Sequence, residues 1–406
     1  MNIGFVSTRF SGTDGVSLEA QKWADALERL GHECFWFSGL SDRPRESSMV
    51  VPEAFFEHPG IQAINDAVWN VDTIPTSIAD SIAENSKHLK TNIDDFCQRF
   101  EIDLLIPQNA LTIPMNLPLG LALTDHIESS GMPTVAHHHD FYWERKRFSG
   151  SGVLPYLEKA FPPASDSITH VVINSEAGRQ LNDRLKLDSI LVPNVMDFEM
   201  TPEGPLASST IKSELGFAKE DILFLQPTRV VPRKGIEHAI ELVSRLEDPR
   251  IKLIISHESG DEGHDYLDSL VALAKARQVD LRLIGDLVGS SSQTPFTLEE
   301  LYQGADFVTY PSLYEGFGNA LLETVYFRRP ALVNRYSVFI DDIEPLGFDF
   351  VTMDGNVTNE TVEQVRQLLA DPVRISATVD HNFEVAKRHF GFNRITDSLT
   401  PILSSL

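Results

Sequence analysis

The sequence alternates between short apolar runs and longer segments of helical periodicity, and this alternation occurs in two separate series. The first series of strand-length runs ends before Asn194, and the second begins at Ile222. Such a pattern is typical of βαβ units, in which each helix returns the chain to the same end of a parallel sheet. Between the two series, residues 198–209 contain two prolines, a glycine and several small residues, as a linker does. The sequence therefore predicts two α/β domains, each with a doubly wound parallel sheet.

The boundaries of the predicted elements locate the loops that can carry function. In the first domain, strands are predicted at 3–7, 34–37, 104–107, 134–137, 170–173 and 190–192, helices at 16–30 and 116–129, and a helical insertion at 41–92. In the second, strands are predicted at 222–226, 251–255, 281–284, 307–309 and 331–333, with a helix at 236–246. We place the N-terminal domain at 1–197, a linker at 198–210, the C-terminal domain at 211–385 and a helical tail at 386–406. Ligands of such sheets bind beyond the C-terminal ends of the strands, so we searched those positions for polar residues.

The acidic composition argues against two kinds of partner. The chain of 406 residues has a formal net charge of −25, whereas a surface that binds nucleic acid needs a positive stripe. The same charge weakens the case for docking on anionic lipid, although a local basic patch still allows peripheral membrane contact. The longest apolar runs are far shorter than a membrane span. We expect neither a nucleic-acid partner nor a transmembrane segment.

The cysteines and the first residues indicate the compartment. Only two cysteines occur, Cys34 in a strand-like run and Cys97 in a predicted helix. Two such thiols provide neither a disulfide framework nor a cysteine-based zinc site. Residues 2–7 form a predicted strand without a basic region or cleavage site, so no signal peptide is expected. The sequence predicts buried free thiols and a cytoplasmic location.

The segment PSLYEGFGN at 311–319 carries the strongest functional signal, because it directly follows a predicted strand. Gly316 and Gly318 would let a ligand approach main-chain N–H groups closely. A helix that begins near Asn319 would point its positive end at the same place. Glu315 in the turn and Glu323 one helical turn later suit hydrogen bonding to sugar hydroxyls. The alternative is a glycine turn in which the two carboxylates only cap or favour the helix.

A second segment, PTRVVPRKG at 227–235, follows the first predicted strand of the second domain. It places Arg229, Arg233 and Lys234 together in an otherwise acidic chain. Cations at this position would neutralise a diphosphate and stabilise it as a leaving group. A solvated basic turn is the alternative, but the position after the first strand of the domain favours a phosphate site.

Together, these segments resemble the family 4 retaining glycosyltransferases of the GT-B fold, in which two Rossmann-like domains face an interdomain cleft. The spacing between Glu315 and Glu323 is the most specific mark of that family, and Arg229 with Lys234 is similar to its phosphate-binding pair. Weaker matches keep the expected order: a glycine-rich loop at 11–17, GHE at 31–33, HD at 139–140, INS at 173–175 and VPNVMD at 192–197. The resemblance spans essentially the whole chain.

The resemblance implies a role for each of these residues. The donor-binding set is Gly12, Gly15, Arg229, Lys234, Glu315, Gly316, Phe317, Gly318, Asn319 and Glu323. Within it, Arg229 and Lys234 would hold the diphosphate, and Glu323 the ribose hydroxyls. Glu315 and the three main-chain amides that follow it would grip the transferred sugar, and the first loop would close over the phosphates. The residues assigned to catalysis are His139, Arg229, Lys234 and Glu315.

Three consecutive histidines, His137, His138 and His139, lie at the end of a predicted strand. Successive side chains of a strand alternate between its faces, so three in a row cannot converge on one metal ion. The resemblance makes His139, which precedes Asp140, the histidine that faces the donor. His137 shares that face if the strand continues, and it is the alternative.

The segment that follows the histidines supplies candidates for acceptor binding. Arg145, Lys146 and Arg147 lie where N-terminal domains of this fold receive acceptors, and one of them would bind an acceptor phosphate or carboxylate. The alternative is a charged, exposed helix start. His137 and Asp14 are further acceptor-binding candidates.

Two positions depart from the pattern of the family. Asp14 stands in a first loop that usually has adjacent glycines, and it either projects toward the acceptor or caps the next helix. Residues 334–336, NRY, follow a strand where the family usually has small residues. Arg335 would reach either the nucleotide or a partner chain.

The resemblance implies a retaining hexosyltransferase that uses a nucleotide diphosphate sugar such as UDP-glucose or GDP-mannose. The acceptor hydroxyl would belong to a small, soluble molecule such as a polyol, an organic acid or a sugar phosphate. The family works without a metal, and the sequence has no Asp-x-Asp motif with a suitable ligand cluster, so no cofactor is expected. The alternatives are a nucleotide-sugar 2-epimerase of the same fold and a non-catalytic protein that binds nucleotide sugars.

Overall fold

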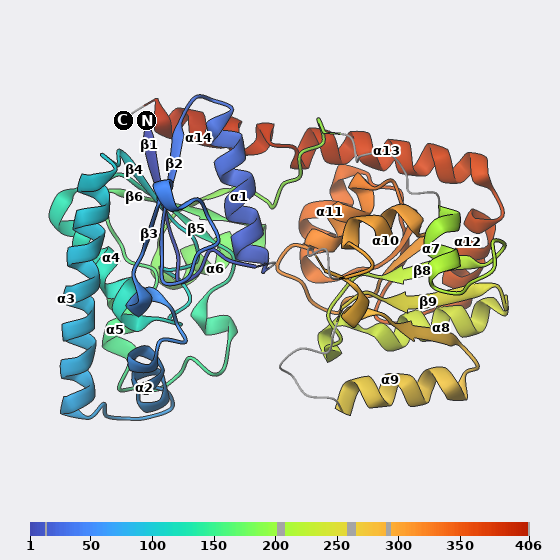
Figure 1. Ribbon diagram of the computed structural model, residues 1–406, viewed down its shortest axis with the longest axis horizontal. Helices are drawn as coiled ribbons and strands as arrows, with labels where there is room; N and C mark the ends of the chain where they lie inside the picture. Colours follow the sequence, from blue (N-terminus) through green and yellow to red (C-terminus); the bar gives the residue numbers. More distant parts are fainter. Residues whose placement is uncertain (13, 201–207, 258–264, 290–293, 405–406) are drawn as a thin grey trace. The chain divides into compact units, whose positions relative to one another are not determined.

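The computed structural model describes residues 1–12, 14–200, 208–257, 265–289 and 294–404. The chain forms two compact units (Figure 1). The N-terminal unit consists of residues 1–195 with 392–406, and the C-terminal unit consists of residues 196–391. The C-terminal unit is therefore inserted between two parts of the N-terminal one. Of the predicted linker at 198–210, residues 201–207 lie outside the described residues.

The sheet of the N-terminal unit has seven parallel strands in the order β3-β2-β1-β4-β5-β6-β7. The strands are β1 (Asn2–Val6), β2 (Glu33–Ser38), β3 (Ser48–Val50), β4 (Leu104–Pro107), β5 (Thr134–His138), β6 (Ile168–Val172) and β7 (Ser189–Leu191). All were predicted within two residues except β3, a three-residue edge strand inside the predicted insertion.

Helices cover both faces of this sheet. They are α1 (Gly15–Glu28), α2 (Pro59–Val68), α3 (Thr76–Arg99), α4 (Leu117–Ser130), α5 (Leu154–Ala160), α6 (Ser175–Leu185) and α14 (Asn393–Leu403). On one face, α1 and α14 lie side by side and share a core with Phe5 and Ile106 (Figure 1). On the other face, α3 and α4 pack on Leu105. Helix α1 buries Ala20, Trp23, Ala24 and Leu27, which have the spacing of one helical face.

The C-terminal unit has a parallel sheet in the order β10-β9-β8-β11-β12-β13. Its strands are β8 (Ile222–Gln226), β9 (Ile251–Ile255), β10 (Asp280–Leu283), β11 (Phe307–Tyr310), β12 (Ala331–Asn334) and β13 (Val351–Met353). Its helices are α7 (Ser208–Glu214), α8 (Ile236–Leu246), α9 (Asp265–Ala276), α10 (Leu298–Gly304), α11 (Asn319–Tyr326), α12 (Asn359–Leu369) and α13 (Pro372–Phe390). One core cluster joins the sheet to α8, α9 and α12, while α10 contacts β8 and α11 contacts β11.

Each sheet reverses its strand order once, between β1 and β4 in the N-terminal unit and between β8 and β11 in the C-terminal unit. At such a switch point the loops after the two neighbouring strands run to opposite sides and leave room for a ligand. The two segments with the strongest sequence signals follow β8 and β11, so both lie at the switch point of the C-terminal unit.

Candidate functional site

The loops after β8 and β11 are fastened to each other. The main-chain N–H of Leu313 donates to the carbonyl oxygen of Arg233 at 2.8 Å. Gly235 has a φ of +58°, and a β-carbon there would lie 2.5 Å from the carbonyl oxygen of Pro311. Only glycine permits both this backbone conformation and this close approach. The structure therefore brings together the two segments that the sequence analysis singled out separately.

Glu315 forms ion pairs with two cations of the neighbouring loop. Its Oε1 pairs with the Lys234 ammonium group, and its Oε2 lies 3.1 Å from Nη1 of Arg233. The side chains of Lys234 and Glu315 are only 11% and 9% exposed. Burial raises the pKa of Glu315, but the charge and hydrogen bond of Lys234, with the charge of Arg233, bring its net pKa below the ordinary value. The carboxylate is therefore ionised at neutral pH and holds both cations in place.

Arg229 adds a third positive charge near Lys234, and the neutral His257 lies close to both. Arg229 is exposed in the loop after β8. His257 lies just beyond β9, where its Nδ1 is 2.9 Å from Oγ of Ser256. Burial, then the charges of Lys234 and Arg229, lower the pKa of His257 to about 4. Sequence analysis missed His257, although its position directly after a predicted strand was a signal that could have revealed it.

Two buried tyrosines hold the glycine turn before α11. Gly318 has a φ of +125°, and a β-carbon there would lie 2.8 Å from the Tyr336 hydroxyl and 3.1 Å from the Tyr310 hydroxyl. The Tyr336 hydroxyl donates to the carbonyl oxygen of Phe317 at 2.7 Å. Burial first, then the charge of Glu315, raises the pKa of both tyrosines well above the ordinary value, so both stay protonated. Helix α11 begins at Asn319, as predicted.

Glu323 lies in the second turn of α11 and is half-buried. The hydroxyl of Tyr302, which is fully buried, donates to Oε2 of Glu323 at 3.0 Å and fixes the carboxylate. Its proposed contact with a ribose stays a prediction, as do the donor contacts of Gly316, Phe317 and Gly318.

Arg335 forms ion pairs within the C-terminal unit, and its contact with a nucleotide or a partner chain stays a prediction. Its guanidinium group pairs with both carboxylate oxygens of Glu344 at 2.8 Å and approaches Asp354 at 3.5 Å. The Asn334 amide donates to the carbonyl oxygen of Ser312 at 2.9 Å. These residues therefore hold loops of the C-terminal unit together.

In the N-terminal unit, Asp14 is the N-cap of α1. Its Oδ1 accepts from the main-chain N–H groups of Val16 and Ser17 at 3.2 Å each, and its Oδ2 pairs with Arg9 at 3.2 Å. Of the two roles considered for Asp14, the structure shows the cap, and acceptor binding stays a prediction. Gly12, with a φ of +78°, donates its N–H to Asp42 at 2.9 Å, and Gly15 is the first residue of α1.

His137 and His139 lie on one side of the strand and His138 on the other, as strand geometry predicts. His138 is buried, and its Nε2 lies 2.9 Å from Nδ1 of His170. His137 is buried on the other face of β5 and stacks on Trp23, with ring centroids 4.1 Å apart. His139 follows the end of β5, is half-buried, and has its ring centroid 4.4 Å from that of His137.

Two residues after β4, Gln108 and Asn109, organise the histidines. Oε1 of Gln108 is 2.9 Å from Nδ1 of His137 and 3.1 Å from Nε2 of His139. Oδ1 of Asn109 accepts from the N–H of His139 at 2.9 Å, and its Nδ2 donates to Asp140 at 2.7 Å. Sequence analysis missed both residues, although they too directly follow a predicted strand.

The basic segment at 145–147 is exposed and follows a single 3₁₀ turn, Tyr142–Glu144, rather than opening a helix. The Arg145 guanidinium pairs with Asp140. The Arg147 guanidinium lies over the Phe148 ring, 4.5 Å from its centroid. Acceptor binding by Arg145, Lys146 or Arg147 stays a prediction.

The histidine cluster should make the N-terminal unit sensitive to acid. Burial lowers the pKa of His139 and His170 to about 4, and it also lowers the pKa of His137 and His138. Because the unfolded chain takes up protons near the ordinary pKa of 6.5, stability is fully present above that pH. It should be lost as the pH falls toward 4, by on the order of 2–3 kcal/mol for His170 alone.

Urea unfolding at several pH values measures this effect. All four tryptophans, Trp23, Trp36, Trp69 and Trp143, lie in the N-terminal unit, so their fluorescence reports on it alone. The variant His170→Gln should show a shallower loss of unfolding free energy between pH 6.5 and 4. An equal slope in the variant and the wild type would contradict the prediction.

Other features of the structure bear on the expectations from composition. Cys34 and Cys97 are free and buried, as predicted, and burial raises the pKa of each thiol to about 12. No helix in the described part of the chain is long and apolar enough to cross a bilayer. Among the same residues, no group of three or more His, Cys, Asp or Glu side chains is placed to hold a metal ion.

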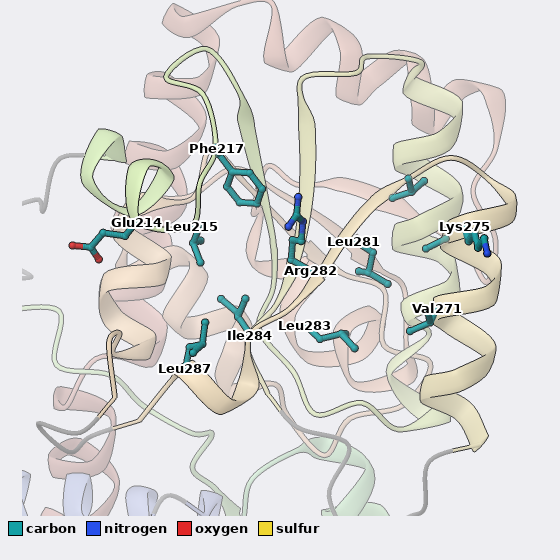
Figure 2. A pocket seen from close by; sticks show the side chains of 12 residues that line it. Glu214, Leu215, Phe217, Val271, Lys275, Leu281, Arg282, Leu283, Ile284 and Leu287 are labelled. Carbon is teal, nitrogen blue, oxygen red and sulfur yellow. The ribbon is translucent and has the colours of Figure 1, made fainter.

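A hollow of about 610 Å³ lies along β10, the edge strand of the C-terminal sheet (Figure 2). Phe217, Leu281 and Ile284 line it, and the Arg282 guanidinium lies 5.4 Å from the centroid of the Phe217 ring. None of the predicted site residues lines this hollow, and β9 separates its strand from β8. Volume alone therefore does not identify the functional site.

Two Rossmann-like units, each with a doubly wound parallel sheet, are the architecture of the GT-B fold. The sequence profile of the family described as "Glycosyl transferases group 1" matches residues 208–385. The chain is 32% identical to the mannosylglucosylglycerate synthase of Thermotoga maritima, over 98% of this chain and 99% of that protein. It is 31% identical to the mannosylglucosylglycerate synthase of Petrotoga mobilis, over 92% and 94%. The chain belongs to this family, family 4 of the glycosyltransferases, and it transfers a sugar.

Solved structures show the same fold. Anabaena HepE in complex with UDP and glucose matches with a TM-score of 0.68 and 16% identity, over 100% of both chains. A glycosyltransferase of Rickettsia africae matches with a TM-score of 0.71 and 12% identity, over 99% of this chain and 97% of that one. These structures confirm the predicted fold, and the relatives in sequence confirm the predicted family.

Proposed function

We propose that this chain is a retaining, metal-independent hexosyltransferase that joins mannose, from a nucleotide diphosphate donor, to glucosylglycerate. The observation that carries the proposal is the buried ion pair of Glu315 with Lys234, which the partly exposed Arg233 joins, at the switch point of the C-terminal unit. The acceptor and the sugar are taken from the name of the two synthases that this chain resembles over nearly its whole length.

The charge of the C-terminal site suits a diphosphate. Three cationic side chains, those of Arg229, Arg233 and Lys234, accompany the carboxylate of Glu315. Positive charge is therefore in excess, and a diphosphate would neutralise it without a divalent cation. The same excess would stabilise the negative charge that develops on the leaving group, which is the role that a metal ion plays in other transferases.

The proposed reaction keeps the configuration of the donor sugar. The bond between the anomeric carbon and the diphosphate oxygen breaks while the acceptor oxygen bonds to that carbon from the same face. The acceptor proton passes to an oxygen of the departing diphosphate, so no side chain has to act as nucleophile. The contribution of the protein is then to position the substrates and stabilise charge. Glu315 would orient the sugar while it holds Lys234 against the diphosphate.

Glucosylglycerate presents a carboxylate as well as hydroxyls, and this fits the acidic acceptor considered from the sequence. Arg145 is the first candidate to bind that carboxylate, because it is exposed and already pairs with a carboxylate, that of Asp140. A cytoplasmic location is part of the proposal, and the two free thiols, Cys34 and Cys97, support it.

A panel of donors and acceptors tests this function. Purified protein in EDTA should release nucleoside diphosphate from one mannose donor only when glucosylglycerate is added, and NMR of the product should show retained anomeric configuration. The variant Glu323→Ala should bind the donor more weakly. Donor consumption without an acceptor would favour the 2-epimerase. An inverted product would exclude the retaining mechanism. A requirement for a metal ion would contradict the proposal that protein cations neutralise the diphosphate.

A further inference from the structure

The C-terminal sheet has an open edge at β10. Within the described ranges of the chain, β10 pairs with β9 alone, and the hollow shown in Figure 2 lies along it. The N–H of Ile284 donates to the carbonyl oxygen of Ile255 at 3.0 Å, and only every second residue of a strand turns its main-chain groups to the same neighbour. The main-chain groups of Leu281 and Leu283 therefore point away from β9, where a further strand could pair with them.

The two faces of β10 differ in chemistry. Leu281 and Leu283 lie on the side of α9 (Figure 2), where Leu281 packs against the core of the unit and Leu283 is 41% exposed. On the other face, Nε of Arg282 donates to Oδ1 of Asp280 at 2.7 Å, and the guanidinium lies beside the Phe217 ring. A strand added at this edge would therefore meet apolar side chains on one face and two opposite charges on the other.

The charges of β10 end a row of alternating sign that crosses the sheet. Nζ of Lys252, in β9, lies 3.9 Å from Asp221, directly before β8, and 3.5 Å from Asp280. Asp280 in turn pairs with Arg282 at 2.7 Å. The row stops at the open edge with Arg282, whose side chain is 53% exposed. A carboxylate on a further strand would continue the alternation.

The charge pattern of β10 is complementary to itself in one antiparallel register. If two copies of β10 pair with Leu281 opposite Leu281, Asp280 lies opposite Arg282 of the second copy, and the two-fold axis repeats this pair. If the centre moves by one residue, either Arg282 faces Arg282 or Asp280 faces Asp280, and like charges in opposite positions are destabilising. The outward main-chain groups of Leu281 would also exchange two hydrogen bonds in the first register. Charge and backbone therefore favour the same register.

We propose that the open edge of β10 binds a second copy of this chain, so that the C-terminal sheets of two copies join across a two-fold axis. Charged residues on an edge strand often prevent such pairing, but Asp280 and Arg282 have opposite signs and attract in this register. The second copy would also cover Leu283 and Val271 of α9, which is 46% exposed. A strand of four residues makes a small interface, so we expect a dimer that dissociates at micromolar concentrations. Because β9 separates β10 from β8, the proposal does not depend on the sugar-transfer function.

Two charge variants should each weaken this dimer. Asp280→Lys gives β10 two positive charges and Arg282→Glu gives it two negative ones, so each variant places like charges opposite each other at two symmetric points. Sedimentation equilibrium of the full-length chain, at up to about 500 μM, should show a dissociation constant about 10–100-fold higher for each variant than for the wild type. Asp248→Lys and Arg250→Glu are the matched controls, because these residues form an ion pair of the same spacing at 2.6 Å but precede β9. Both controls should dimerise as the wild type does.

The two β10 variants should bind each other. In a mixed pair, the two positive charges of Asp280→Lys face the two negative charges of Arg282→Glu, so every opposite position again holds unlike charges. Native mass spectrometry of an equal mixture resolves the mixed dimer by its mass, and that dimer should exceed both dimers of a single variant. Two variants that had merely lost their fold would not restore binding to each other.

Hydrogen exchange, followed by mass spectrometry, locates the interface in the wild type. The peptide that contains Leu281 and Leu283 should exchange more slowly at high than at low protein concentration, and Asp280→Lys should abolish the difference. A wild type that is monomeric at the highest concentration would overturn the proposal. So would a dimer that both β10 variants form as tightly as the wild type, or a mixture of the variants that forms no mixed dimer.

Discussion

The variant Lys234→Met should lower kcat/KM for sugar transfer by about 100–1,000-fold, which is the range for loss of one group that stabilises developing charge. Lys234 is buried beside Glu315, so no solvent-exposed lysine can replace it at the same point. The assay is nucleoside diphosphate release with saturating acceptor. Lys275→Met, on α9 and lining the hollow along β10, is a control that should keep wild-type activity.

The same substitution should also destabilise the C-terminal unit, and a second variant separates the two effects. Removal of one partner of a buried ion pair typically costs about 3–5 kcal/mol, because the other charge stays buried. Arg233 remains paired with Glu315 and should reduce that cost. The double variant Lys234→Met with Glu315→Leu leaves no unpaired carboxylate and should recover most of the stability without the activity. Wild-type transfer by the double variant would show that the ion pair is only structural.

Gly235→Ala should separate the two loops of the donor site and abolish donor binding. The new β-carbon would lie 2.5 Å from the carbonyl oxygen of Pro311, a contact that only a backbone shift can relieve. The positive φ of +58° adds about 1–2 kcal/mol for any residue with a β-carbon. Overpacking of this kind typically costs a further 1–3 kcal/mol. The shift would also move Arg233, whose carbonyl oxygen accepts from Leu313.

Gly216→Ala is the matched control for this prediction. Gly216 has a φ of +75°, and a β-carbon there would meet nothing within 4 Å, so the control has the backbone strain without the clash. Calorimetric unfolding should show a larger destabilisation for Gly235→Ala, and isothermal titration should show donor binding only for Gly216→Ala. If both variants bind donor alike, the close approach of the loops is not needed for the site.

Sequence patterns located most strands of both sheets, and the two strands that they missed are alike in length and position. The predicted strands at 104–107, 222–226 and 251–255 are those of the structure, because buried parallel strands are continuous apolar runs. The missed strands, β3 and β13, are three residues long and lie at sheet edges. An edge strand of that length gives little periodicity to detect, although β7, equally short and also at an edge, was predicted at 190–192.

The donor site was easier to predict from the sequence than the contacts of the histidines in the N-terminal unit. Arg229, Lys234 and Glu315 lie in short segments with a recognisable spacing, so their loops were located before their contacts were known. The surroundings of Gln108 depend on contacts with His137, in β5, and with His139 just after it. No local sequence pattern reveals such a contact, because it arises only when two strands far apart in the sequence pair in the sheet. Position directly after a strand was the one signal available.

The end of the chain shows how helical periodicity can conceal a boundary. A single tail was predicted at 386–406, and the helical pattern does run through most of it. In the structure, α13 continues to Phe390 in the C-terminal unit, while α14 starts at Asn393 and belongs to the N-terminal unit. Only two residues, Gly391 and Phe392, separate the helices, and Gly391 was the one sequence signal of the break.

The position of α14 has a consequence for how the chain acquires its structure during synthesis. Ile395 and Leu399 of α14 are buried in the same core as Phe5 and Trp23. That core therefore stays open to solvent until translation has passed through the whole C-terminal unit. The inserted unit needs no residue after Gly391, because it consists of one continuous stretch of chain, residues 196–391. On the ribosome, the unit encoded first should be the last to become resistant to protease.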